Sequence, residues 1–312
     1  MTNRYLGVDP MLTDVAIAYS NDDYIADLIF PEYRVAKQSG KHFVYDRGAF
    51  RVESTERAAG ANSKELNHNV TVGTPYFAED HSLREFVPDE DVKNAITPTS
   101  PFIDATEFVT HGLLVAKEKQ LADMLRSTTI MTQNITLAGT DQWSDYSNLV
   151  ASDPIGDIQL GMTTIHGAIY MNANTLILGR QVWDRLKNHP NILARVQYTQ
   201  KAVMTADLLA SLIGVDRVLI GGAGFNQAKE GQTDSMTYIW GKDAILCYIA
   251  PVIRPKMMTL GFTYLWENMQ VERLRGSDEE DRKGTYVRVG NYYYQQKLVS
   301  VEAGYLIKNA VA

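Results

Sequence analysis

The first 40 residues alternate between short apolar runs and polar breaks. The apolar runs cover 15–19 and 24–30, and Pro10 and Pro31 interrupt regular secondary structure. This apolar content is too dispersed to close a hydrophobic core of its own. The pattern therefore predicts an extended N-terminal arm that packs on something else.

Two strand-like stretches follow, and a polar segment separates them. Aromatic and β-branched residues are frequent in 43–52 and again in 70–86, as is typical of β-strands. The segment between them, 54–67, reads STERAAGANSKELN and is small, polar and glycine-bearing. This arrangement predicts two long strands that project a mobile loop.

The longest helical pattern begins at Ser100 and Pro101. Serine can cap free amides, and proline at the first helical position loses no hydrogen bond. Apolar residues then recur at steps of three to five as far as about Arg126. The pattern predicts a helix of roughly 37 Å, long enough to brace the whole molecule.

The remainder of the chain mixes helices and strands in an irregular order. Helices are expected at 154–170, 181–188 and 206–212, strands at 175–178, 217–220, 236–249 and 257–266, long loops at 221–234 and 276–283, and a returning sheet at 285–311. Because this is not a regular βαβ series, the predicted fold class is α+β.

Composition and charge narrow the class of protein. With 312 residues, 45% hydrophobic, the chain suits one large elongated fold or two interleaved lobes. A net charge of -7 opposes tight binding of phosphates, which needs clustered lysine and arginine. The charge therefore fits a protein that encloses DNA better than one that binds a specific DNA sequence. The single cysteine, Cys247, suits a reducing cytoplasm, and no window approaches the roughly 18 apolar residues of a membrane span.

Candidate chemistry is weak. The segment 218–228 places Gly222 and Gly224 after a predicted strand, as in dinucleotide sites, but the third glycine is missing and a polar loop follows. The six histidines are scattered singly, and the four consecutive carboxylates at 278–281 lack the spacing of a calcium loop. Neither a cofactor, a metal nor a catalytic residue is predicted.

Three passages resemble a known family. They are ADLIFPEYRVAKQSGKHFVYDRGAFR at 26–51, ILGRQVWDRLKNHP at 177–190 and EGQTDSMTYIWGKDAILCYIAP at 230–251. They are similar to major capsid proteins of tailed bacteriophages, whose Hong Kong 97 type fold also has an arm, a projecting hairpin, a spine helix and a mixed lobe in this order. The resemblance implies a structural protein of the virion and not an enzyme.

The resemblance also implies a division of the chain. An N-terminal arm would cover 1–40, an extended loop 41–87, a peripheral domain 88–150 with its spine helix at 101–126, and an axial domain 151–255. The strands of 256–312 would return to the axial and peripheral domains. Residues expected at subunit contacts are Glu53, Glu56, Arg57, Lys64 and Glu65 of the extended loop and Phe225 and Asn226 of the axial domain.

The implied partners are copies of the same chain, arranged as hexamers and pentamers around icosahedral axes. The shell would assemble in the host bacterial cytoplasm and enclose double-stranded DNA without sequence preference, with a portal and a separate scaffolding protein and possible decoration proteins. No covalent crosslink is predicted. Two alternatives stay open: an encapsulin-like compartment of the same fold, and a small-molecule enzyme with 221–234 as its substrate loop.

Overall fold

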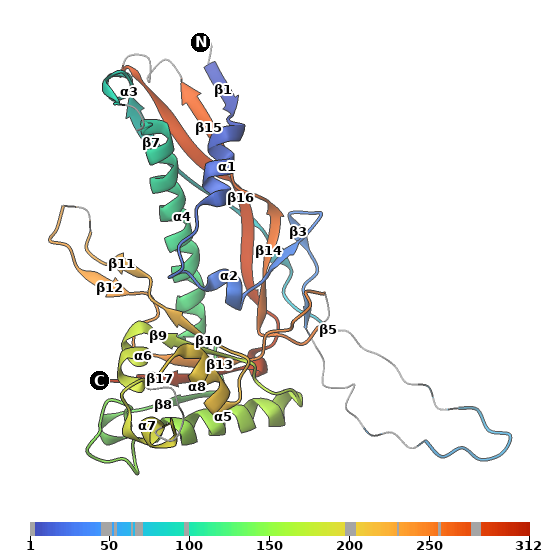
Figure 1. Ribbon diagram of the computed structural model, residues 1–312. Coiled ribbons are helices and arrows are strands. Elements are labelled where there is room, and N and C mark those ends of the chain that lie inside the picture. Colours follow the sequence, from blue (N-terminus) through green and yellow to red (C-terminus); the bar gives the residue numbers. More distant parts are fainter. Residues whose placement is uncertain are drawn as a thin grey trace.

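An elongated molecule is seen in the computed structural model, which describes residues 4–44, 52, 55–63, 65, 71–96, 100–196, 204–229, 231–254, 257–275 and 282–312. Figure 1 shows one long helix, α4 (Pro101–Leu125), running from a sheet at the top of the molecule into a lobe at the bottom. We call these two parts the upper and lower lobes. The predicted helix at 101–126 is thus confirmed to within one residue. Its start differs in detail, because the Ser100 side chain makes no capping hydrogen bond.

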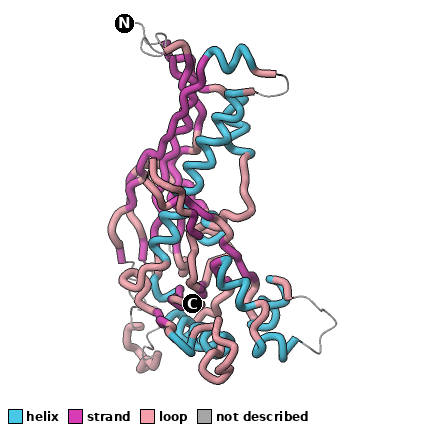
Figure 2. Tube along the Cα trace, turned by 90° about the vertical axis from the view of Figure 1, so that its left-hand side faces the viewer, coloured by secondary structure: helices cyan, strands magenta, loops and turns pink. Residues whose placement is uncertain are grey.

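The upper lobe is built on a six-stranded sheet of the described residues. Its strands are β1 (Arg4–Val8), β2 (Glu32–Arg34), β7 (Glu79–Pro88), β14 (Gly261–Glu267), β15 (Gln270–Arg275) and β16 (Gly284–Leu298). β14 and β15 follow one another along one edge of β16, and β7 lies along its other edge, all three antiparallel to it. β1 pairs with β15 and β2 with β14. The central strands form a long ribbon, and Figure 2 shows helices lying beside it as a second layer.

Alternation along β16 decides which face of this sheet is covered. Val287 and Val289 are fully buried and belong to the same apolar cluster as Val109 and Leu113 of α4. Since neighbouring side chains of a strand point to opposite faces, Tyr286 and Arg288 lie on the face away from α4. Two further helices, α1 (Pro10–Ala18) and α3 (Asp89–Asn94), pack near the upper end.

The lower lobe holds a five-stranded mixed sheet of the described residues. In order across the sheet, the strands are β10 (Arg217–Gly221), β9 (Thr175–Gly179), β13 (Ala244–Cys247), β17 (Gly304–Lys308) and β8 (Asn134–Thr136). The helices around it are α5 (Pro154–Ile169), α6 (Arg180–Leu186), α7 (Pro190–Val196) and α8 (Ala206–Ile213). Every residue of β9 and β13 is buried, so this sheet is the centre of the largest apolar cluster.

The expected extended arm is wrong for most of its described length. Pro10 does not interrupt structure there but opens α1 as the first helical residue, and the Asp9 carboxylate accepts hydrogen bonds from the amides of Met11 and Leu12. Further on, α2 (Ala26–Ile29) and Phe30 are buried in the core cluster of the lower lobe. The apolar runs of this segment therefore cover the chain's own spine helix.

Other expected boundaries also shift. The paired strands at the base of the extended loop are short: β3 (Ser39–Gly40) with β6 (Tyr76–Phe77), and β4 (Phe43–Val44) with β5 (Thr71–Val72). The predicted strand at 236–249 is two strands, β12 (Met236–Tyr238) and β13, and the predicted loop 221–234 contains β11 (Gly224–Asn226). α7 and β15 were not predicted. Short 3-10 helices occur at Gly139–Asp141 and Val301–Ala303.

Candidate assembly surfaces

The extended loop projects from the side of the molecule, as Figure 1 shows at the lower right. Glu56, Arg57 and Glu65 are exposed in it, whereas Glu53 and Lys64 lie outside the described residues. The guanidinium of Arg57 donates a hydrogen bond of 2.8 Å to the carbonyl of Ala61 and so closes the tip. Glu56 and Glu65 form no ion pair with another described residue.

A second projection leaves the opposite side of the molecule. It is the hairpin of β11 and β12 (Figure 1). The Asn226 side chain fastens it: its amide nitrogen donates to the Asp234 carboxylate at 2.7 Å, and its oxygen accepts from the amides of Ala228 and Ser235 at 3.0 Å. Phe225 is half-buried under the ammonium of Lys119, 5.1 Å from the ring centre. Asn226 thus shapes this hairpin from within.

Two glycines of 218–228, the segment that resembled a dinucleotide site, lie close against other side chains. A side chain on Gly221 would collide with the indole of Trp240, and one on Gly222 would collide with the carboxylate of Asp23. Trp240 is almost fully buried beneath β10. The close approach of the tryptophan to the backbone accounts for the missing side chain at Gly221.

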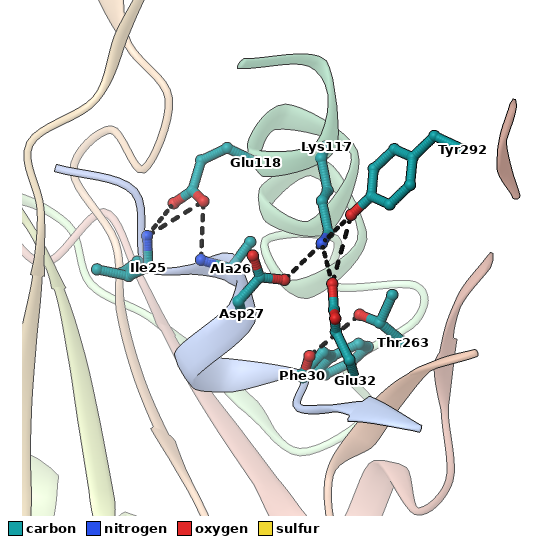
Figure 3. A network of polar contacts seen from close by, with 9 residues as sticks. All are labelled: Ile25, Ala26, Asp27, Phe30, Glu32, Lys117, Glu118, Thr263 and Tyr292. Carbon is teal, nitrogen blue, oxygen red and sulfur yellow. Dashed lines mark hydrogen bonds and ion pairs between the residues drawn. The ribbon is translucent and has the colours of Figure 1, made fainter. Parts of the chain in front are cut away.

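A polar junction that was not predicted joins the N-terminal segment to α4, as Figure 3 shows. The Lys117 ammonium, 1% exposed, lies 2.5 Å from the Asp27 carboxylate and 3.1 Å from that of Glu32. It also donates to the hydroxyl of Tyr292 on β16 at 2.7 Å. Burial alone would lower the pKa of Lys117, but Tyr292, Asp27 and Glu32 outweigh it and raise that pKa above its ordinary value. The lysine therefore stays charged and ties three segments together.

Glu118, the next residue of α4, binds the same segment from another direction. Its carboxylate, 1% exposed, accepts from the amide of Ile25 at 3.1 Å and of Ala26 at 2.8 Å. It also accepts from the indole nitrogen of Trp240 at 2.6 Å. Burial raises the pKa of Glu118, while these donors oppose the shift. The glutamate caps the first turn of α2 and links it to the lower lobe.

The lower end of α4 is held by a second buried carboxylate. Arg126 donates to Asp243 at 2.6 Å and to the carbonyl of Ile239 at 2.7 Å. Asp243 also accepts from the amide of Asn309, beside β17, at 2.9 Å. The Lys308 ammonium donates to the carbonyl of Arg126 at 2.7 Å. The spine helix is thus tied to segments distant in sequence both at its middle and at its lower end.

One signal in the sequence could have revealed the junction. The apolar repeat of the helix jumps from Ala116 to Leu121, and Lys117 and Glu118 stand where buried residues are due. Charged residues at buried helix positions are normally paired. Their partners in the N-terminal segment could not be read from spacing, because about 90 residues separate them.

The single cysteine, Cys247, is buried in β13. Burial raises the pKa of the Cys247 thiol in β13 to about 12. Within the described ranges, no three His, Cys, Asp or Glu side chains are placed to hold a metal ion. Among the same residues, no helix combines the length and apolar character needed to cross a membrane.

Comparison with known proteins gives the family. The family model described as phage major capsid protein E matches residues 114–250. A major capsid protein of Pseudomonas phage JBD67 is 30% identical over 100% of both chains. A solved phage-related protein from Bordetella bronchiseptica is 26% identical, with a TM-score of 0.76 over 99% of both chains. The solved capsid structure of cyanophage P-SCSP1u has the same fold at 8% identity, with a TM-score of 0.57 over 89% of this chain and 86% of the other.

These matches favour a phage shell over the encapsulin-like alternative, and the family is a structural one. The spine helix, the long ribbon and the mixed lobe agree with the fold that the sequence predicted. The chain belongs to the phage major capsid proteins of the Hong Kong 97 type fold and is a structural subunit of the phage shell.

Proposed function

We propose that this subunit forms hexamers and pentamers of an icosahedral head that encloses double-stranded DNA. The observation that carries this proposal is the shape of the subunit, with two projections that leave the body on opposite sides (Figure 1). The described tips of both projections are exposed on this subunit. Projections of this kind suit heterologous contacts that close around a symmetry axis.

The proposed division of labour follows the lobes. Residues 1–40 act as the arm, 41–87 as the extended loop, 88–150 as the peripheral domain and 151–255 as the axial domain. The segment 256–312 contributes strands to both domains in this proposal. Its support is that β16 lies in the upper sheet and β17 in the lower sheet. The contacts of 1–40 with α4 support an arm whose described part is anchored on its own subunit.

Apolar side chains left exposed by the subunit support the same proposal. Large apolar side chains are exposed at many points of the described surface, among them Met11 of α1 at 65%, Phe108 of α4 at 67% and Met236 of β12 at 72%. An exposed apolar side chain on a projecting hairpin, such as Met236, suits a surface that a neighbour covers.

The remaining partners are inferred from the role. The net charge of -7 fits a wall that encloses DNA without gripping it. Assembly in the host cytoplasm, with a portal, a separate scaffolding protein and possible decoration proteins, completes the proposal.

Deleting 55–67 tests the role of the extended loop. The variant should unfold at the same urea concentration as the wild type, because the described residues of 55–67 belong to none of the apolar clusters. It should give few shells in electron micrographs, because a contact with the neighbour is lost. Deleting 228–234 removes the tip of the other projection, which the proposal also assigns to a contact with a neighbour, and should lower the shell yield too. Wild-type shell yield from the 55–67 deletion would contradict the assignment of this loop.

A further inference from the structure

The outer face of the upper sheet carries an unusual pairing of like charges. Arg84 of β7 and Arg288 of β16 are direct cross-strand partners, on the face away from α4. Like charges directly opposite one another destabilise a sheet. Arg288 has nearby carboxylates, Asp80 at 3.7 Å and Glu272 at 3.5 Å. Arg84 is exposed and has no carboxylate partner among the described residues.

Aromatic rings hold the arginines in place. The Arg84 guanidinium lies 4.3 Å from the ring centre of Tyr286, and that of Arg282 lies 4.2 Å from Phe86. Arg282 also donates to the Tyr286 hydroxyl at 2.8 Å, and the two rings meet edge to face at 5.1 Å. We call Arg84, Phe86, Arg282, Tyr286 and Arg288 the arginine–aromatic patch. Its stacked guanidinium groups are fixed in position while their charge stays exposed, as suits recognition of a carboxylate or phosphate.

The charge around the patch favours a short acidic segment over a polyanion. Asp80 and Glu272 lie beside Arg288 and offset its charge, so the patch is not a continuous basic surface. Nucleic acid binding needs several phosphates to be neutralised by a continuous basic surface. One or two carboxylates need only Arg84 and Arg282, which form no ion pair with a carboxylate among the described residues.

The extended loop offers such carboxylates. Glu56 and Glu65 are exposed and have no cationic partner within the described residues, and Arg57 of the same loop is turned to its own backbone. In Figure 1 the loop projects away from the upper end of β7 and β16, so it cannot reach the patch of its own subunit. We infer that the arginine–aromatic patch binds the Glu56 and Glu65 carboxylates from the extended loop of a second copy of this chain. This inference rests on the proposed shell function and names one of its contacts.

A charge-reversal experiment on the full chain tests the contact. The patch variant carries Arg84→Glu and Arg282→Glu, the loop variant carries Glu56→Arg and Glu65→Arg, and a third protein carries all four changes. The measured quantity is the lowest protein concentration at which shells form, by light scattering and electron microscopy. Each exposed ion pair changes an association constant by up to about fivefold. Each two-residue variant affects two pairs and should therefore raise this concentration by up to about 25-fold, and the four-residue protein should return to within about twofold of the wild type.

The controls separate the possible failures. Arg195→Glu reverses an exposed arginine of the lower lobe and should leave the concentration unchanged. Urea unfolding of each variant shows that its subunit is folded, and Arg84→Gln with Glu56→Gln repeats the test without new charge. The inference is overturned if the wild type forms shells and the two-residue variants assemble as it does. It is also overturned if the four-residue protein is not rescued. A patch variant that assembles normally but packages less DNA would also overturn it, in favour of a phosphate ligand. If the wild type forms no shells, the proposed function itself fails.

Discussion

Two consecutive charged residues, Lys117 and Glu118, are buried in the middle of the spine helix, where apolar side chains are expected. Desolvating them costs free energy that only good partners offset. Lys117 meets two carboxylates and a hydroxyl, and Glu118 meets three N–H donors. At the residue scale, this pair fixes where the N-terminal segment lies on α4.

The variant Glu118→Gln tests that role with almost no change in shape. The amide group would present a donor to one of the buried N–H groups that now bind a carboxylate oxygen. We expect the free energy of unfolding to fall by about 1–3 kcal/mol. Urea unfolding of the purified subunit measures this. Glu107→Gln on the exposed face of the same helix is the control and should change it by less than about 0.5 kcal/mol. Equal stability of the two variants would contradict the account of the junction.

At this scale the sequence predicted little of the site. Asn226 was expected at a subunit contact, and its side chain instead fastens its own hairpin, a role that does not test that contact. Lys117 and Glu118 were not predicted because their partners come from the first 34 residues. Spacing along a chain reveals neighbours on one helix but not contacts between distant segments.

At the scale of single elements, one carboxylate fixes the position of α1. Asp9 caps α1 and also forms an ion pair with Arg273 of β15, so the carboxylate fixes both the start of the helix and its place on the sheet. Leu12 and Ala16 then face the core, at the spacing of one helical turn. The proline that follows Asp9 is compatible with this start.

Substituting Asp9 separates these two contributions. Asp9→Ala removes the cap and the ion pair and should lower the free energy of unfolding by about 1–2 kcal/mol. Asp9→Asn keeps a capping oxygen and loses only the half-exposed ion pair, so it should cost less than about 1 kcal/mol. Thermal or urea unfolding of the two variants decides the order. An alanine variant as stable as the wild type would show that α1 is not held by its cap.

Elements with a strong period were predictable, and elements fixed by tertiary contacts were not. α4, α5 and β9 follow directly from their apolar periods. α1 was not predicted because a proline inside a helix interrupts it. Pro10 instead stands at the first helical position, where proline is favoured. β15 is short and rich in charged residues, and its position depends on pairing with β16.

At the scale of the whole molecule, one chain ties two lobes together at several points. The spine helix spans both, the C-terminal segment adds a strand to each sheet, and the N-terminal segment is anchored at the junction. The order of arm, loop, helix and mixed lobe was predictable by resemblance. The folding of the arm onto its own subunit was not, because dispersed apolar residues do not say which surface they cover.

The central claim is that the projections and exposed apolar side chains of this subunit are completed by copies of the same chain. Negative-stain electron microscopy of the purified full-length protein, over a series of concentrations, tests it most directly. The account predicts closed shells of uniform size above a threshold concentration. Particles that stay at the size of a single 34.9 kDa subunit under every assembly condition would contradict it.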